Sequence, residues 1–305
     1  MKVIVAGGSG FIGHALVEAL LRAGDEPVVL SRRATEAERR LADGAQVAQW
    51  TGEEVEPALV AGADAVVNLS GASIGAGRWT RGRKARILAS RVRSTAALVE
   101  ALAQAEPRPR VLVNASGIDY GGDRGDDEID ENVAPGDTFL ARVCVEWEAA
   151  ARPAEELRVR VVCMRTPLVL GREALALRLM ALPFRVGLGG RLGDGRQWFP
   201  FVHLEDAVAL YRVALEDESL AGPLNLAAPE QVRQRDVALE LGRVLHRPAR
   251  FPTPAPLLRL VLGEQADLLL HGQRASAQRA LATGYRFRYP TVAGALEEAL
   301  GRDRR

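Results

Sequence analysis

Residues Ala6–Gly13 read AGGSGFIG, and this stretch predicts the fold. A β-branched run at residues 3–6 precedes it, and residues 11–22 follow with apolar residues at helical spacing. Glycines spaced in this way between a strand and a helix give a tight turn, close backbone approach to a pyrophosphate, and close helix–strand packing. The stretch therefore indicates a dinucleotide-binding βαβ unit, and a purely structural turn is the alternative.

The same strand–helix alternation continues along the chain. Further strands are predicted at residues 27–30, 46–50, 65–69, 111–115 and 157–164, with a long helix at 84–105. Repeated βα units with continuously apolar strands are typical of an α/β fold, here a Rossmann-type doubly wound parallel sheet.

The pattern changes after about residue 171. A glycine-rich loop occupies residues 187–195, four prolines lie between residues 248 and 256, and an apolar helix is predicted at 256–270. We therefore expect an NADP-binding Rossmann domain at residues 1–172, to which residues 201–229 return. Residues 173–200 and 230–305 are expected to form a smaller C-terminal α+β domain that binds substrate.

The composition favours a protein that handles small molecules. The net charge of +1 gives no reason to expect nucleic acid or a membrane surface as a partner. The N-terminus enters a strand pattern without a signal peptide, and no apolar run reaches the length of a membrane span, so a cytoplasmic location is expected. Cys144 and Cys163 lie in apolar runs typical of core thiols, and the four histidines lack metal-ligand spacing.

The second strand ends in Ser31, Arg32 and Arg33, where a carboxylate would favour NAD. A guanidinium group there accommodates a 2′-phosphate instead, which favours NADP(H) as the cofactor. The alternative is that both arginines only begin the solvated face of the charged run at residues 32–40.

The fourth strand ends in NLSG at residues 68–71, on the edge of the sheet where open α/β folds bind ligands. The predicted cofactor-binding residues are Gly7, Ser9, Gly10, Phe11, Ile12, Gly13, Ser31, Arg32, Arg33, Asn68, Leu69, Ser70, Gly71 and Arg91.

These residues, together with several later stretches, make the chain resemble an atypical group of the short-chain dehydrogenase/reductase superfamily. This group is close to the sugar-nucleotide epimerases, and its members are usually named epimerase family proteins and end in a domain of unknown function. The stretches that carry the resemblance span the chain: GGSGFIG at Gly7, RWTRGRKARILASR at Arg78, PGDTFLARVCVEWEAAA at Pro135, PFRVGLGGRLGDGRQWFPFVHLEDAV at Pro183, NLAAPE at Asn225 and LLLHGQRASAQRALATGYRFRYP at Leu268.

The chain departs from the group after the fifth and sixth strands. Asp119 stands where a glycine is usual, Gly121 where a tyrosine is usual, and Pro167 where a glycine is common. The change at Gly121 removes a tyrosine on which a catalytic role could otherwise rest.

Ordinary members of the superfamily carry Tyr-x-x-x-Lys on one helix, where the lysine lowers the tyrosine pKa for proton exchange. No tyrosine of this chain is followed by lysine at the fourth position. The helix within DTFLARVCVEWE at residues 137–148 offers Phe139 and Val143, or Leu140 and Cys144, in their place.

Catalytic groups must therefore come from elsewhere. Ser116, Asp119 and Tyr120 follow the fifth strand on the ligand-binding edge, and Tyr120 is the first choice as a proton donor. A tyrosine packed beneath the second domain is the alternative. Arg196 and Trp198, after the glycine-rich loop, are candidates for contacting substrate, whereas the resemblance implies a mainly structural role for His203 and Asp206.

Two functions fit the sequence. The first is an NADP(H)-binding oxidoreductase or epimerase-like enzyme acting on a small polar or sugar-like substrate. The second is a cofactor-binding regulatory protein without turnover, which the missing tyrosine and lysine favour. The apolar stripes of the helices at 84–105 and 137–151 would allow a homodimer, or would be covered within one chain.

Overall fold

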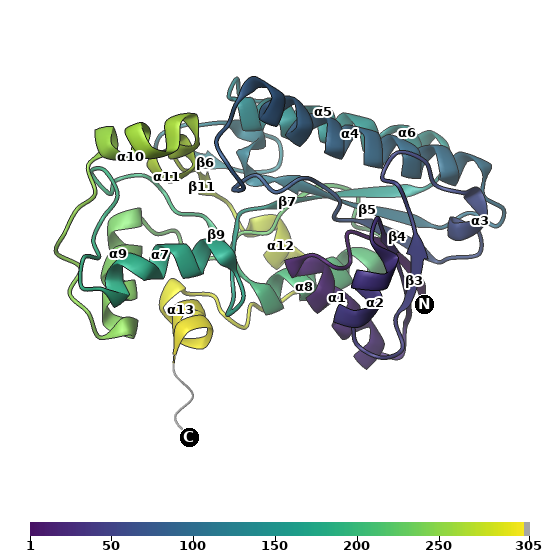
Figure 1. Cartoon of the computed structure of the whole chain (residues 1–305). Coiled ribbons are helices and arrows are strands. Elements are labelled where there is room, and N and C mark those ends of the chain that lie inside the picture. Colours follow the sequence, from purple (N-terminus) through teal and green to yellow (C-terminus); the bar gives the residue numbers. More distant parts are fainter. Residues whose placement is uncertain (302–305) are drawn as a thin grey trace.

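The computed structural model describes residues 1–301, and its centre is a sheet of seven parallel strands in the order β10-β7-β5-β4-β1-β2-β3 (Figure 1). The strands are β1 (Lys2–Ala6), β2 (Glu26–Ser31), β3 (Gln46–Gln49), β4 (Ala65–Asn68), β5 (Val111–Gly117), β7 (Arg160–Thr166) and β10 (Gly222–Asn225). The chain runs outward from β1 to β3 and then returns to the other side of β1 with β4. Ligands bind where a sheet reverses in this way, at the carboxyl ends of β1 and β4.

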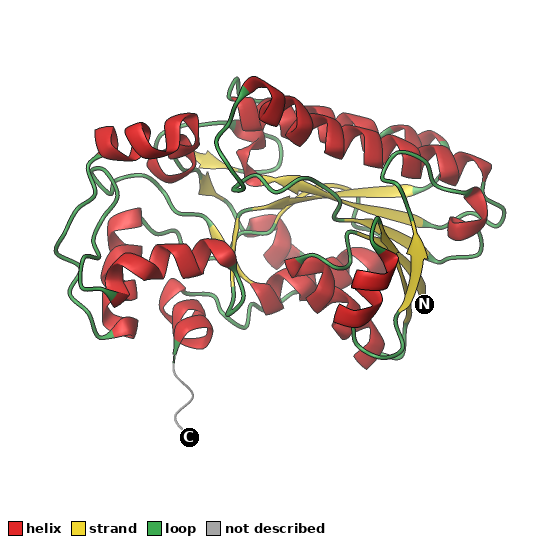
Figure 2. Cartoon of the chain, viewed as in Figure 1, coloured by secondary structure: helices red, strands yellow, loops and turns green. Residues whose placement is uncertain are grey.

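Helices cover both faces of this sheet, which confirms the doubly wound architecture (Figure 2). One face packs against α1 (Phe11–Arg22), α2 (Ala34–Arg40) and α8 (Leu204–Glu216). The opposite face packs against α3 (Pro57–Val60), α4 (Arg81–Gln104), α5 (Phe139–Ala151) and α6 (Pro153–Glu156). Successive strand residues alternate between the two cores, as with Val3 and Ile4, so strands buried on both faces are apolar throughout.

A smaller C-terminal region lies at one end of the sheet (Figure 1). Its helices are α7 (Leu175–Arg185), α9 (Gln234–Leu245), α10 (Ala255–Leu262), α11 (Asp267–Leu270) and α13 (Val292–Leu300), with a 3₁₀ turn, η2, at Gly263–Ala266. The helix α12 (Gln278–Ala282) instead packs beside β10, and its Ala280 belongs to the main core. Two short parallel ladders join the C-terminal region to the rest: β6 (Glu128–Ile129) with β11 (Arg274–Ala275), and β8 (Leu168–Leu170) with β9 (Phe201–His203).

Two predicted elements differ most from the structure. The helix predicted at residues 256–270 is divided at Gly263, which has φ +61° and so takes the chain out of the α-helix before η2 and α11. The strand predicted from residue 157 begins only at Arg160, because the turn before it contains Arg158 at φ 60°. Within residues 1–301, each helix is too short or too polar to cross a membrane.

Candidate functional site

The glycine loop between β1 and α1 brings three backbone segments into close contact. Gly7 has φ +82°, and a Cβ there would lie 2.8 Å from the carbonyl carbon and oxygen of Leu69 in the loop after β4. The Gly10 amide donates to the Gly7 carbonyl at 3.0 Å. A Cβ at Gly13 would lie 2.4 Å from that same carbonyl oxygen, so the first turn of α1 can pack against the loop only through glycine. The N-terminus of α1 thereby opens toward the carboxyl edge of the sheet.

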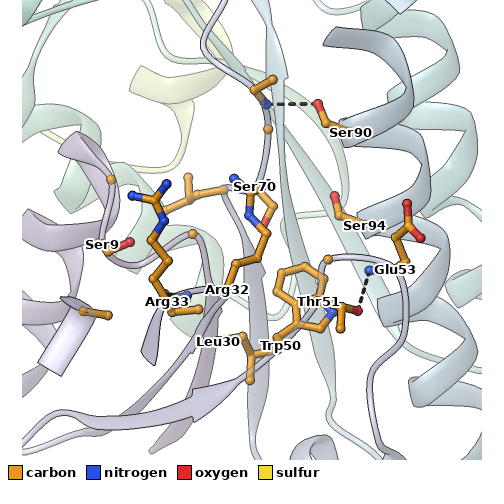
Figure 3. Close-up of a pocket in the computed structure, with 18 of the residues that line it drawn as sticks. Ser9, Leu30, Arg32, Arg33, Trp50, Thr51, Glu53, Ser70, Ser90 and Ser94 are labelled. Carbon is orange, nitrogen blue, oxygen red and sulfur yellow. Dashed lines mark hydrogen bonds between the residues drawn. The ribbon is translucent and has the colours of Figure 1, made fainter. Parts of the chain in front are cut away.

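A cavity of about 780 Å³, here called the outer cavity, opens beside this loop (Figure 3). Nine of the predicted cofactor-binding residues line it: Gly7, Ser9, Gly10, Ser31, Arg32, Arg33, Leu69, Ser70 and Gly71. Figure 3 shows Arg32 and Arg33 on one side of the cavity and Ser90 and Ser94, from α4, on the other. The cavity therefore has a basic wall from the segment after β2, and it faces a wall from α4 that carries hydroxyl groups as well as Arg86 and Arg93.

The arginines of the outer cavity differ in whether their charge is already neutralised. Arg33 pairs with Glu36 at 3.1 Å, and Arg93 pairs with Glu53 at 2.9 Å. Within the described chain, Arg32 and Arg86 form no ion pair with a carboxylate, so their charge is available to a ligand. A guanidinium group in this position suits a phosphate, because the pairing is charge-assisted and bidentate.

A second cavity of about 340 Å³, the inner cavity, adjoins the first and shares Gly7, Gly10 and Leu69 with it. Six further predicted residues line it: Phe11, Ile12, Gly13, Arg91, Ser116 and Asp119. The two cavities thus meet at the glycine loop. That arrangement fits a dinucleotide, with its pyrophosphate at the shared residues and one nucleoside in each cavity.

Arg91 is a buried cation on the wall of the inner cavity. Its Nη1 donates to the carbonyl oxygens of Ala72 at 3.0 Å and Ile87 at 3.1 Å, and its guanidinium lies 4.9 Å from the Trp147 ring. Burial lowers the pKa of Arg91 to about 10, so the group is still charged at neutral pH.

Helix α5 presents an apolar face to the inner cavity. Leu140, Val143, Cys144 and Trp147 line it. Of the two pairs considered in place of tyrosine and lysine, Leu140 and Cys144 both line the cavity, whereas Phe139 does not. Burial raises the pKa of the Cys144 thiol to about 12, which keeps it protonated. The α5 residues on the inner-cavity wall therefore supply neither a titrating acid/base nor a cation at neutral pH.

Ser116 is joined to a buried ion pair. Its hydroxyl donates to Glu148 Oε1 at 2.7 Å, and Glu148 accepts from Arg165 Nε at 2.9 Å and Nη2 at 3.0 Å. Both Glu148 and Arg165 are buried. Because the hydroxyl proton points to Glu148, the Ser116 oxygen is free to accept a hydrogen bond from a ligand in the cavity.

Asp119 contributes a carboxyl group to the same cavity. Gln273 Nε2, from the C-terminal region, donates to its Oδ1 at 3.4 Å. Burial raises the pKa of the Asp119 carboxyl, and the hydrogen bond from Gln273 only partly opposes that effect.

Two other predicted residues lie outside both cavity walls. The Tyr120 ring is buried and lies 3.6 Å from the guanidinium of Arg165, a residue of β7 in the main sheet. Asn68 is also buried, and its Nδ2 donates to Thr95 and Asn114 while its Oδ1 accepts from the Ser70 amide at 3.1 Å. Asn68 thus holds the loop that lines the cavities.

The predicted substrate residues Arg196 and Trp198 likewise lie outside both cavity walls. Trp198 Nε1 donates to Asp126 at 3.1 Å, and its ring lies 3.6 Å from the Arg233 guanidinium. The Arg196 carbonyl accepts from Arg233. The structure therefore places both residues in a polar cluster of the C-terminal region.

His203 and Asp206 connect the sheet region with the end of the chain. His203 Nε2 lies 2.9 Å from Glu298, and its Nδ1 accepts from the Glu205 amide at the start of α8. Asp206 accepts from the Tyr285 hydroxyl at 2.7 Å. Neither residue lines the outer or the inner cavity.

Sequence reasoning missed several residues of the site. Arg86, Ser90 and Ser94 of α4 and Trp50 after β3 line the outer cavity, and Gln273 reaches Asp119. The four-residue spacing of the α4 set was a usable signal, because it places all three on one helix face. Gln273 carried no such signal, since it approaches from a distant part of the chain.

Comparison with known proteins agrees with this geometry. Residues 3–227 match the family model described as the NAD dependent epimerase/dehydratase family, and residues 253–299 match a domain of unknown function, DUF1731. The chain is 39% identical to epimerase family protein Mb2239 of Mycobacterium bovis, with 98% of each chain covered. It is 37% identical to human epimerase family protein SDR39U1, covering 98% of this chain and 99% of that protein.

The solved structures extend the comparison to the fold. The human SDR39U1 structure, crystallised with NADPH, aligns with a TM-score of 0.86 and 35% identity, covering 98% and 99% of the two chains. UDP-glucuronic acid 4-epimerase from Bacillus cereus aligns with a TM-score of 0.81 over 98% of each chain, but at 18% identity it supports the fold alone. The chain therefore belongs to the NAD dependent epimerase/dehydratase family, as an epimerase family protein with a C-terminal DUF1731 domain.

Proposed function

We propose that the protein is an NADP(H)-dependent oxidoreductase or epimerase-like enzyme that acts on a small polar or sugar-like substrate. The observation that carries this proposal is the pair of cavities joined at the glycine loop, with unpaired cations at one end and hydroxyl and carboxyl groups at the other. The related human protein crystallised with NADPH supports the choice of cofactor.

Each cavity would bind a different part of the cofactor. Arg32, with Arg86 opposite, would hold the 2′-phosphate in the outer cavity, and the backbone amides at the start of α1 would hold the pyrophosphate. The nicotinamide half would enter the inner cavity beside Arg91 and Ser116. When bound, the cofactor supplies or accepts a hydride, and the protein contributes orientation and a proton path.

A second candidate function is a regulatory protein that binds NADP(H) without turnover. The observation in its favour is the apolar face of α5, where Leu140 and Cys144 stand at the cavity wall. The two candidates differ in one outcome. Oxidation of NADPH in the presence of a panel of aldehydes and ketones would support the enzyme, and binding without any oxidation would support the regulator.

Titration with NADPH and NADH, followed by nicotinamide fluorescence, tests cofactor binding. A charge-assisted hydrogen bond contributes about 1.5–3 kcal/mol, so Arg32→Ala should weaken NADPH binding by about 10- to 100-fold and leave NADH binding nearly unchanged. Arg39→Ala is the matched control, because Arg39 lies on the exposed side of α2 and outside the cavity. Equal affinity of the wild-type protein for NADPH and NADH would contradict the role of Arg32, and binding of neither would contradict the proposal.

A further inference from the structure

Within residues 1–301, the Asp119 carboxyl is a half-buried acid without a neutralising cation. It lies on the wall of the inner cavity. Within residues 1–301, the one hydrogen bond that its side chain receives from another residue comes from Gln273. Among these described residues, Asp119 forms no ion pair with an arginine or lysine. Partial burial without a cation raises the pKa of the Asp119 carboxyl, because it disfavours the charged form.

The other described titratable groups around the cavity do not supply a free cation that would stabilise the Asp119 carboxylate. Helix α5 contributes the Cys144 thiol, which stays protonated, and Glu148, which is already paired with Arg165 from β7. Helix α8 contributes the neutral Tyr211 hydroxyl, whose pKa is raised by burial. Among the described residues of the cavity wall, Arg91 from α4 is the one cation, and its Nη1 bonds go to carbonyl oxygens.

We propose that Asp119 is the proton donor of the inner cavity and that Gln273 is a positioning residue that holds it from the C-terminal region. The inference deepens the proposed function and rests on it for the hydride. Asp119 is the only carboxyl group that the described cavity wall contains, and Ser116 beside it directs its own proton toward Glu148.

The proton balance of the step is simple. As a carbonyl carbon of the substrate gains a hydride from bound NADPH, its oxygen gains the electron pair of the C=O π bond and a proton from Asp119. The O–H bond of the carboxyl breaks, and the O–H bond of the product alcohol forms. The Asp119 carboxylate then takes a proton from water through the cavity, and the carbonyl compound has been reduced by two electrons at the expense of NADPH.

An amide is well suited to position such an acid. The Gln273 side chain can donate through its nitrogen to the carboxylate or accept through its oxygen from the protonated form. It therefore gives Asp119 a hydrogen-bond partner in both states without adding a charge. Gln273 belongs to the C-terminal region and Asp119 to the segment after β5. Gln273 can therefore hold the Asp119 carboxyl only when these two parts are packed together.

Infrared difference spectroscopy of the NADPH-bound protein tests the protonation state directly. At neutral pH, wild type should show the C=O stretch of a neutral carboxylic acid that Asp119→Asn lacks. Gln273→Lys, which adds a cation beside the carboxyl, should remove that band. Gln273→Leu, which removes the donor that lowers the Asp119 pKa, should keep the band to higher pH than wild type. A wild-type spectrum without the band would overturn the proposal.

Two controls keep this comparison clear. Gln231→Leu makes the same side-chain change at a residue that contacts Arg274 and lies outside both cavities, and its spectrum should match wild type. Thermal unfolding and the NADPH dissociation constant of each variant show whether it is folded and binds cofactor. A shift of the band in Gln231→Leu as large as in Gln273→Leu would overturn the positioning role.

Turnover of 4-nitrobenzaldehyde with NADPH tests the donor role itself. General acids contribute on the order of 10²–10⁴ in rate, so Asp119→Asn should lower the rate of turnover by at least about 100-fold. The wild-type rate should fall as pH rises through the Asp119 pKa, and Gln273→Leu should move that fall to higher pH. An unchanged rate and pH profile in Asp119→Asn would overturn this inference alone. NADPH binding without any turnover of carbonyl compounds would overturn both it and the enzymatic function.

Discussion

Asp119 and Tyr120 are neighbours in the chain, yet their side chains lie in different surroundings. They lie in the 3₁₀ turn η1 (Ile118–Gly121), which directly follows β5. In this turn Asp119 faces the inner cavity, while the Tyr120 ring packs on Arg165. Sequence reasoning could place residues 116–120 at the ligand-binding edge, but the side that each residue faces depends on a turn that ends the alternation of the strand.

The half-buried carboxyl of Asp119 also affects stability. Its pKa is raised in the folded protein, whereas the pKa of an aspartate in the unfolded chain is about 3.9. Below that value both states hold the proton and the carboxyl contributes no pH dependence. As pH rises above it, the unfolded chain loses the proton first, so the folded state is progressively destabilised until pH passes the raised pKa.

Asp119→Asn should therefore stabilise the protein at neutral pH and not at pH near 4. The gain corresponds to about 1.4 kcal/mol for each unit by which the folded pKa is raised. Urea unfolding at the two pH values measures it. Asp43→Asn, a matched change at an exposed position outside both cavities, should alter stability by less than about 0.5 kcal/mol. Equal effects of Asp119→Asn at both pH values would contradict the raised pKa.

Among the elements, the junction of β1 and α1 followed most directly from the sequence. Its glycine spacing predicted the approach that the structure shows between Gly13 and the Gly7 carbonyl. The role of helix α4 was harder to predict from the sequence, because the helix contacts the sheet and both cavities. Leu98 and Leu102 pack on the sheet, Arg91 reaches the inner cavity, and Ser90 reaches the outer one. Apolar periodicity reveals only the first of these.

Two glycine-to-alanine substitutions compare the β1–α1 junction with an open helix position. Gly13→Ala would put a methyl group 2.4 Å from the Gly7 oxygen and 2.7 Å from the Gly8 Cα, so α1 must move and the two cavities should lose their shared wall. We expect NADPH binding to fall by more than about 10-fold, at the cost of roughly 1–3 kcal/mol of stability. Isothermal titration and urea unfolding measure the two effects.

Gly82→Ala is the matched control on α4. A Cβ at Gly82 meets no atom within 4 Å, and alanine favours the helix by about 0.5–1 kcal/mol, so stability should be unchanged or slightly higher. NADPH affinity like that of wild type in Gly13→Ala would show that the junction tolerates the methyl group and is not required for binding.

At the scale of the whole molecule, the C-terminal residues are part of the main core. Tyr285 and Phe287 pack against the cluster that contains β1, β5 and α8 side chains. Asp206, fully buried on α8, accepts from the Tyr285 hydroxyl and from the backbone amides of Arg288 and Tyr289. The sequence predicted a structural role for this stretch through resemblance, but its partners lie about 80 positions later and could not be paired by any local pattern.

Asp206→Ala tests whether the sheet and the C-terminal residues unfold together. It would leave two backbone amides and a tyrosine hydroxyl without their acceptor, and an unsatisfied buried group costs about 1–3 kcal/mol. We therefore expect unfolding free energy to fall by roughly 3–5 kcal/mol in one cooperative transition, measured by urea unfolding with far-ultraviolet circular dichroism and tryptophan fluorescence. Asp217→Ala, at the other end of the same helix, removes a half-exposed carboxylate that accepts from the amide and hydroxyl of Ser219, so its cost should stay below about 1 kcal/mol.

The two probes distinguish cooperative unfolding from local release. If the two probes report coincident transitions in wild type and in both variants, the hydrogen bonds to Asp206 stabilise the entire molecule. If Asp206→Ala instead left the main transition unchanged and only accelerated hydrogen exchange in residues 285–300, the C-terminal segment would be a separate unit. In that case Gln273 could move away from Asp119 without unfolding of the sheet, and occupancy of the inner cavity would depend on docking of the C-terminal region.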